Sequence, residues 1–119
     1  MPKTLTIILK SGTMMNMDSV VATKLARAAR SKGYSVRIFC YGEGVTAIKK
    51  GQEPKRFPNT GKEMEELARE GVEIAVCETC CTARGITRGE EIEGGKIGSL
   101  TNDFVNFVGE SDRVITLGR

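Results

Sequence analysis

The chain has 119 residues, of which 39% are hydrophobic and 28% charged, enough for one globular domain with its own core. Its net charge of +3 comes from 18 basic and 15 acidic residues mixed along the chain, and only 5% of residues are aromatic. We therefore expect no direct nucleic-acid binding, which favours a basic face and stacking rings. No apolar run approaches the ~20 residues of a membrane span, so we expect a cytoplasmic protein without membrane contact.

The N-terminal third predicts two strands joined by a helix. Residues 4–9 are apolar and β-branched, which is typical of a short buried strand. Asp18 is a favourable N-cap residue for the helical pattern that follows, and Gly33 supplies the end of that helix. Residues 35–41 predict the second strand.

The middle of the chain predicts a loop, a helix and a third strand. Residues 42–59 form a polar connection with two prolines, and a short helix is predicted within it. Thr60 and Glu63 have the spacing of a capping box, which predicts a helix that ends at Gly71. Residues 72–77 then predict the third strand.

The last third predicts a helical turn near Glu78, a glycine-rich loop over 85–99, a helix over 100–108 and a final strand over 112–117. Strands that alternate with helices favour a parallel sheet. The predicted fold class is therefore α/β. We expect a three-layer sandwich with a mainly parallel sheet of four to five strands and helices on both faces. The whole chain, 1–119, is predicted to be a single domain.

Three of the four cysteines lie within the segment "CETCC" at 77–81, and the chain has no histidine. Cys77 and Cys40 each end a predicted strand, which is the edge where ligands and reactive groups sit in parallel sheets. In a reducing cytoplasm such thiols are reactive, metal-binding or buried rather than part of a disulfide framework. Cys77 is the leading candidate for a functional residue, with Cys80 and Cys81 as candidate helper thiols.

Three uses of these thiols compete. A zinc site is not expected, because Cys80 and Cys81 point differently on a helix and no histidine completes the ligand set. Cys77-Glu-Thr-Cys80 is a CxxC pair at a strand-to-helix junction, as in thiol–disulfide redox proteins. The third use is covalent group transfer on one thiolate. A helix N-terminus and Arg84, a candidate anion-binding residue, would stabilise that thiolate, whereas burial would oppose it.

The segment "VCETCCTARGI" resembles a conserved segment of the DsrE/DsrF-like sulfur-relay family, in which a strand ends in Cys and Arg-Gly-Ile or Arg-Gly-Leu follows after six residues. Here these are Cys77 and Arg84-Gly85-Ile86. Three other stretches fit in the same order, so that the resemblance spans nearly the whole chain: "SKGYSVRIFCYGEGV", "KEMEELAREGVEIAVC" and "GGKIGSLTNDFVNFVGESDRVITLG".

The resemblance implies an α/β sandwich that assembles as a homotrimer or homohexamer and needs no cofactor. It implies a sulfurtransferase-like relay protein, similar to the TusD and DsrE subunits of transfer-RNA thiolation and sulfur-oxidation systems. Cys77 would carry sulfane sulfur as a persulfide between donor and acceptor proteins. Cys80 and Cys81 lie outside the simplest family pattern. Either one could attack the persulfide, release sulfide and leave a disulfide.

Two alternatives remain open from the sequence. Some family members lack the cysteine, so a non-catalytic oligomeric scaffold is the first alternative, and a CxxC redox protein that uses Cys77 and Cys80 is the second. The loop after the first strand should lie at the same edge as Cys77. We therefore expect Met14, Met15 and Asn16 to line the site, because methionine adapts to irregular surfaces.

Overall fold

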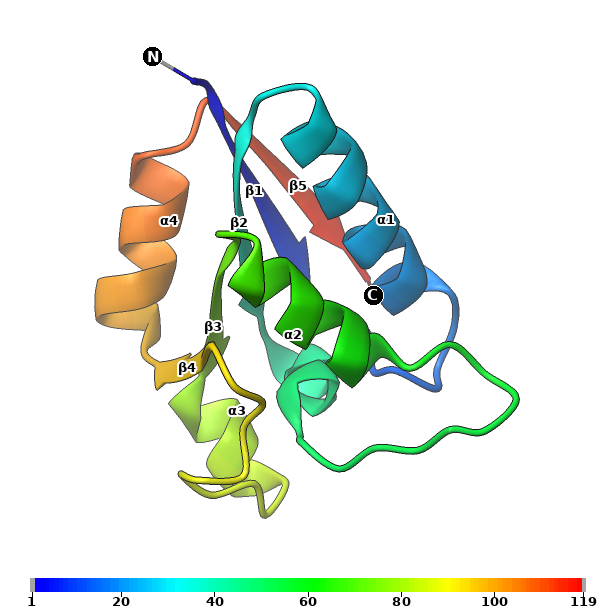
Figure 1. Cartoon of the computed structure of the whole chain (residues 1–119). Coiled ribbons are helices and arrows are strands. Elements are labelled where there is room, and N and C mark those ends of the chain that lie inside the picture. The colour runs from blue at the N-terminus through cyan, green and yellow to red at the C-terminus, as the bar shows by residue number, and fades with distance from the viewer. Residues whose placement is uncertain (1, 119) are drawn as a thin grey trace.

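The computed structural model describes residues 2–118, and Figure 1 shows its central parallel sheet flanked by helices. Five strands pair in the order β4-β3-β2-β1-β5, all in parallel. The strands are β1 (Thr4–Leu9), β2 (Ser35–Cys40), β3 (Glu73–Cys77), β4 (Gly95–Gly98) and β5 (Arg113–Leu117). This arrangement confirms the predicted α/β fold class.

Six helical segments connect these strands. They are α1 (Asp18–Ser31), the 3₁₀ helix η1 (Gly42–Ile48), α2 (Thr60–Arg69), α3 (Glu78–Ala83), the π-helical turn η2 (Leu100–Phe104) and α4 (Val105–Gly109). Helices α1 and α2 cover one face of the sheet, and η2 with α4 covers the other (Figure 1). Among the described residues, none of these helices has the length and apolar content that a bilayer crossing requires.

Both faces of the sheet contribute to the core. On the side of α4, the Phe39 ring packs edge-on against Phe104 and Phe107, with ring centroids 5.3 and 6.2 Å apart. On the side of α1 and α2, the fully buried residues include Ile7, Leu9, Ile38, Met64, Leu67 and Val76. Because both faces are covered, the strands are nearly continuous apolar runs rather than alternating ones.

The predicted helix starts require two corrections. Asp18 is the first residue of α1 rather than its N-cap, and its carboxylate accepts a hydrogen bond from Ser11 Oγ at 2.7 Å. The N-cap of α2 is Asn59, whose side chain accepts a hydrogen bond from the Lys62 N–H at 3.0 Å. The predicted Thr60–Glu63 capping box is therefore wrong by one residue, and Glu63 is free to bind another helix.

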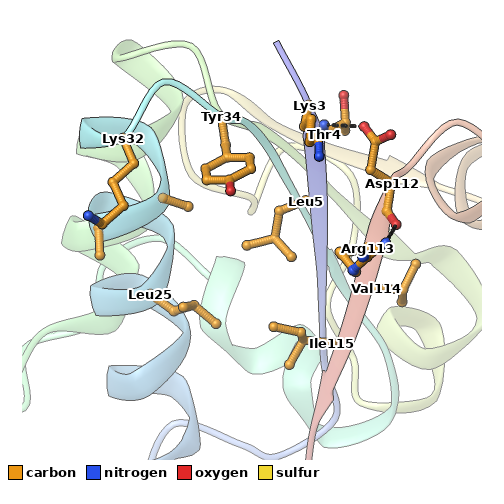
Figure 2. A pocket seen from close by; sticks show the side chains of 12 residues that line it. Lys3, Thr4, Leu5, Leu25, Lys32, Tyr34, Asp112, Arg113, Val114 and Ile115 are labelled. Atoms are coloured by element: carbon orange, nitrogen blue, oxygen red, sulfur yellow. Dashed lines mark hydrogen bonds between the residues drawn. The ribbon is translucent and has the colours of Figure 1, made fainter.

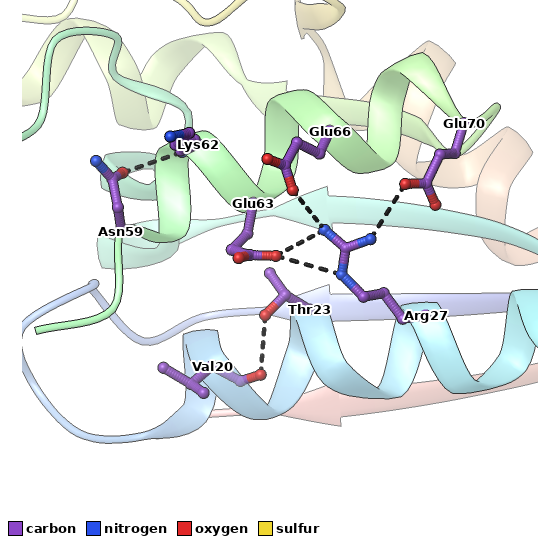
Figure 3. A network of polar contacts seen from close by, with 8 residues as sticks. All are labelled: Val20, Thr23, Arg27, Asn59, Lys62, Glu63, Glu66 and Glu70. Atoms are coloured by element: carbon purple, nitrogen blue, oxygen red, sulfur yellow. Dashed lines mark hydrogen bonds and ion pairs between the residues drawn. The ribbon is translucent and has the colours of Figure 1, made fainter.

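Glu63 is used to join α2 to α1. Arg27 of α1 reaches Glu63 and Glu66 of α2 and its C-cap residue Glu70, with N–O distances of 2.6, 3.0 and 3.2 Å (Figure 3). All four side chains are 36–50% exposed, so water screens these ion pairs. The hydrogen bond with Glu63 is the largest cause of the raised pKa of Arg27, although burial opposes the shift.

The C-terminal third also differs from expectation in two places. The predicted glycine-rich loop contains strand β4, which pairs with β3 in the register Ile74–Gly95 to Cys77–Gly98. The predicted helix over 100–108 begins as the wider turn η2 and becomes the α-helix α4 only at Val105. Each change concerns the segment that lies beside Cys77.

Candidate functional site

Cys77 ends β3 and directly precedes α3. Its backbone is extended, with φ −71° and ψ 120°, and its side chain is buried, with the residue 3% exposed. Ala75 is in register with Phe39, which faces η2 and α4. Side chains alternate along a strand, so Cys77 faces the same side as Ala75. The predicted placement of Cys77 at the carboxyl edge of the sheet is confirmed.

Cys80 lies one helical turn beyond Cys77 and is only partly buried. Its Sγ accepts a hydrogen bond from the Gly42 backbone N–H at 3.3 Å. Burial raises the pKa of the Cys80 thiol, a hydrogen bond with Cys77 adds to that rise, and the Gly42 N–H and Arg84 oppose it. The two thiols of the CxxC pair lie at the start of α3, and both are free of a disulfide.

Cys81 and Cys40 are both buried, so their thiols are less exposed to solvent than the Cys80 thiol. Burial, with smaller contributions from charge on Cys77 and Cys80, raises the pKa of Cys81 to about 11. Burial raises the pKa of Cys40 to about 12, with a smaller contribution from Cys81. These two thiols stay protonated at neutral pH, and a protonated thiol is a weak nucleophile.

Arg84 joins α3 to η1. Its Nε donates to Glu43 Oε1 at 2.9 Å, its Nη2 pairs with the same oxygen, and its Nη1 donates to the Cys80 carbonyl at 2.8 Å. The hydrogen bond from Arg84 lowers the pKa of Glu43. Sequence reasoning missed Glu43, because nothing local indicates a partner 41 residues away. The anion-binding role of Arg84 stays a prediction.

Met14, Met15 and Asn16 form a loop after β1 that makes mostly local contacts. The Met15 Sδ accepts a hydrogen bond from the Gly12 N–H at 3.1 Å. Asn16 donates to Ser11 Oγ at 3.3 Å. Met14 is 63% exposed and lines a hollow with Gln52, Glu53 and the two loop prolines. None of these described contacts involves a cysteine, and their role in lining the site stays a prediction.

A hollow of about 360 Å³ opens on the η2 side of the sheet, at the carboxyl ends of the strands. It is lined by Ile8, Lys10, Tyr41, Leu100, Phe104 and Thr116. Cys40 of β2 is in register with Val76 of β3. Tyr41, the residue after Cys40, is therefore level with Cys77, the residue after Val76. The hollow is thus one strand away from Cys77, on the same face. Sequence reasoning missed it, since its residues come from four separate segments.

A second hollow, of about 440 Å³, lies between α1 and the neighbouring strands β1 and β5 (Figure 2). Its apolar wall includes Leu5, Leu25, Val114 and Ile115, and its described lining residues include no cysteine. Although larger, this hollow lies away from the thiols, and it holds no cluster of reactive groups. We therefore assign the candidate site to the carboxyl edge around Cys77.

The described residues include no group of three or more cysteine, aspartate or glutamate side chains arranged to hold a metal ion. What the edge does present is a buried thiol, a second and partly exposed thiol one helical turn away, and the ion pair of Arg84 and Glu43 beside them. Thiolates of this kind attack electrophilic sulfur, so the arrangement can support sulfur transfer or disulfide exchange.

Comparison with known proteins identifies the relatives of this chain. The model of the DsrE/DsrF-like family matches residues 3–117. An uncharacterized protein of Methanopyrus kandleri (MK0008) is 33% identical over 111 residues, covering 93% of this chain and 91% of its own. Protein YchN of Escherichia coli is 29% identical over 113 residues, covering 92% and 96% respectively.

Solved structures agree with the sequence comparison. The crystal structure of YchN matches with a TM-score of 0.90 and 28% identity, covering 98% of this chain and all of that one. A Methanobacterium thermoautotrophicum protein of unknown function (MTH1491) matches with a TM-score of 0.74 at 19% identity, and this match supports the fold alone. With the family pattern covering nearly its whole length, the chain belongs to the DsrE/DsrF-like family.

Proposed function

We propose that this protein is an intracellular sulfur carrier, a sulfurtransferase-like relay subunit that accepts sulfane sulfur as a persulfide on Cys77 and passes it to a partner protein. The observation that carries the proposal is the position of Cys77 at the carboxyl end of β3, in a chain that matches the family over residues 3–117. Neighbouring thiol Cys80 and the Arg84–Glu43 pair lie at the same edge.

The transfer needs no oxidant. The Cys77 thiolate attacks the outer sulfur of a donor persulfide, R–S–SH, forming Cys77–S–SH while the donor sulfur leaves as the thiolate R–S⁻. In the second step, an acceptor thiolate attacks the outer sulfur on Cys77. Cys77 then leaves as thiolate and is ready for another cycle. Each step exchanges one sulfur–sulfur bond for another.

The burial of Cys77 shapes how a partner reaches it. At 3% exposure, the sulfur is shielded from bulk water and from small reductants. Transfer therefore requires local opening at the carboxyl edge, which a docked partner protein would favour and which a small donor present in excess would use when it occurs spontaneously. The hollow formed by Tyr41, Leu100 and Phe104 provides an apolar surface one strand away, where such a partner could insert a side chain.

Assembly as a homotrimer or homohexamer is part of the proposal. Strand β5 is an outer strand, and its Val114 and Ile115 are 39% and 38% exposed. An outer strand with exposed apolar side chains tends to be covered in the working assembly. We place this assembly in the cytoplasm, where a reducing environment would keep the four thiols free.

A CxxC redox protein is the second candidate, and the position of Cys77 and Cys80 in the first turn of α3 favours it. Such a protein needs both thiols, whereas a carrier needs Cys77 alone. A scaffold of the same fold would tolerate loss of both.

A persulfide trap separates these candidates. Reduced protein is incubated with an alkyl persulfide donor, blocked with an alkylating agent and mapped by mass spectrometry. We expect one extra sulfur on Cys77 in the wild type and in Cys40→Ser, and none in Cys77→Ser. Cys40 is a matched control because it is a buried cysteine that ends the neighbouring strand β2. A Cys77–Cys80 disulfide in the wild type, with no persulfide trapped on Cys77 in Cys80→Ser either, would instead favour the redox protein.

A further inference from the structure

Cys80 stands apart from the other cysteines in its exposure. Among the described residues, Cys40, Cys77 and Cys81 are buried, and Cys80 alone is partly open to solvent. It nevertheless lies one helical turn beyond Cys77, at the start of α3. The relay reaction proposed above uses Cys77 and leaves Cys80 without a role.

The separation of the two residues permits a disulfide between them. Cys77 is the N-cap of α3 and Cys80 is its third residue. Side chains three positions apart on a helix have Cβ atoms about 5–6 Å apart. A disulfide requires Cβ atoms about 3.5–4.5 Å apart, so the first turn of α3 must shift by roughly 1 Å, together with a rotation of the side chains, to join the sulfurs.

The surroundings hold the Cys80 sulfur in place. The Gly42 N–H points at Sγ from η1, and Arg84 ties η1 to α3 through Glu43 and the Cys80 carbonyl. Burial raises the pKa of Cys80, so that most of the thiol stays protonated at neutral pH. A protonated thiol attacks slowly, which gives an acceptor protein time to take the sulfur first.

We propose that Cys80 is the resolving thiol of the carrier, which discharges an undelivered persulfide on Cys77 as hydrosulfide and closes a Cys77–Cys80 disulfide. This inference rests on the proposed function. Cys80 loses its proton to solvent and attacks the inner sulfur, the one bonded to the Cys77 carbon. The Cys77 sulfur–sulfur bond breaks, and its electron pair leaves with the outer sulfur as HS⁻.

The electrons balance within the site. The sulfane sulfur is reduced to sulfide, and the two cysteine sulfurs are oxidised together to the disulfide. A dithiol reductant of the thioredoxin class then returns both cysteines to thiols. The closed disulfide blocks Cys77 against new sulfur, so the carrier is switched off until that reduction occurs.

Cys81 provides a matched control for Cys80. It is the next residue on the same helix, but it is 1% exposed and lies on the inner side. The pKa of Cys81 is raised to about 11, mainly by burial. Among the described contacts, no backbone N–H donates a hydrogen bond to the Cys81 sulfur, in contrast to Cys80. Cys81→Ser should therefore leave discharge intact, while Cys80→Ser should remove it.

The experiment uses full-length protein loaded with an alkyl persulfide donor and freed of that donor by gel filtration. Released sulfide is followed over time, and the peptide that contains residues 77–81 is mapped. Wild type and Cys81→Ser should release about one sulfide per chain and form an internal disulfide. In Cys81→Ser, Cys80 is the only other cysteine of that peptide, so the map is unambiguous. Cys80→Ser should keep its Cys77 persulfide about tenfold longer.

Three results would overturn the inference. One is loss of sulfur from Cys80→Ser at the wild-type rate, and another is a disulfide that needs Cys81. The third is an extra sulfur found on Cys80 itself, which would mean attack on the outer sulfur. Equal persulfide lifetimes in all variants would refute the resolving role but leave the carrier intact. Absence of any persulfide on Cys77, in wild type and Cys80→Ser alike, would instead refute the proposed function.

Discussion

Replacement of Gly44 by alanine should disturb both the stability of the fold and the environment of Cys80. Gly44 lies in η1 and packs against the end of β1. A Cβ built on Gly44 would meet the Leu9 carbonyl carbon at 2.8 Å, and the carbonyl oxygen still closer. Reaching an ordinary contact of about 3.4 Å requires η1 to move by roughly 0.6 Å or more.

The expected cost follows from that displacement. Overpacking against a rigid backbone typically destabilises a protein by about 1–3 kcal/mol. The same movement shifts Gly42, which also belongs to η1, relative to Cys80 and disturbs their 3.3 Å hydrogen bond. Cys80 would lose the contact that orients its sulfur. We therefore expect a lower free energy of unfolding together with faster alkylation of Cys80.

Gly109→Ala is the matched control. Gly109 ends α4, its φ is not positive, and a Cβ added there would meet no atom within 4 Å. Alanine in that helix should be neutral or stabilise it by up to about 1 kcal/mol. Urea unfolding at equal protein concentration, followed by circular dichroism, measures both variants. If Gly44→Ala unfolds at the same urea concentration as Gly109→Ala and its Cys80 reacts at the wild-type rate, the close approach of η1 to β1 is refuted.

Two further predictions concern charged groups. Arg27→Gln should lower the free energy of unfolding by about 1 kcal/mol, because Arg27 binds three carboxylates, whereas the control Arg69→Gln loses only the 3.8 Å pair with Glu65. In urea unfolding, about 0.5 M salt should shrink the difference in stability between the two variants, because salt screens exposed ion pairs. A difference that salt leaves unchanged would contradict this prediction. Burial opposes a low pKa of Asp103, but hydrogen bonds from Lys96 and the Ser99 N–H lower that pKa below its ordinary value of 3.8. The stabilisation that these hydrogen bonds give the folded protein is therefore present above pH 3.8 and is lost as pH falls through the pKa of Asp103 in the folded state. The stability advantage of wild type over Asp103→Asn should therefore be full at about pH 6 and fade below about pH 4, and a constant advantage would refute this.

The strands could be predicted because their residues are apolar over uninterrupted runs. The predicted strand over 4–9 matches β1, and those over 35–41, 72–77 and 112–117 each differ from the observed strand by one residue. The position of Cys77 followed from the same signal, since the apolar run of β3 ends at that cysteine. Where both faces of a strand are buried, its residues form an uninterrupted apolar run, and that run alone predicts the strand.

Strand β4 could not be predicted, because its sequence "GKIG" carries only one apolar residue and two glycines. It exists because β3 offers an unpaired edge, which is a tertiary cause. The Asn59 cap was missed for a local reason, since Asn59 and Thr60 are adjacent and both residue types are favourable caps. The Arg84–Glu43 pair was missed because it joins residues 41 positions apart.

The cysteine site illustrates what the third dimension adds to a sequence motif. The spacing of Cys77, Cys80 and Cys81 is equally compatible with several chemistries, because it says nothing about exposure. Burial separates the three thiols: Cys77 is shielded, Cys81 is held protonated inside, and Cys80 is partly exposed one helical turn beyond Cys77. A carrier must protect its sulfur from water yet release it when no acceptor arrives. A buried thiol beside a partly exposed one meets both requirements on a single helical turn.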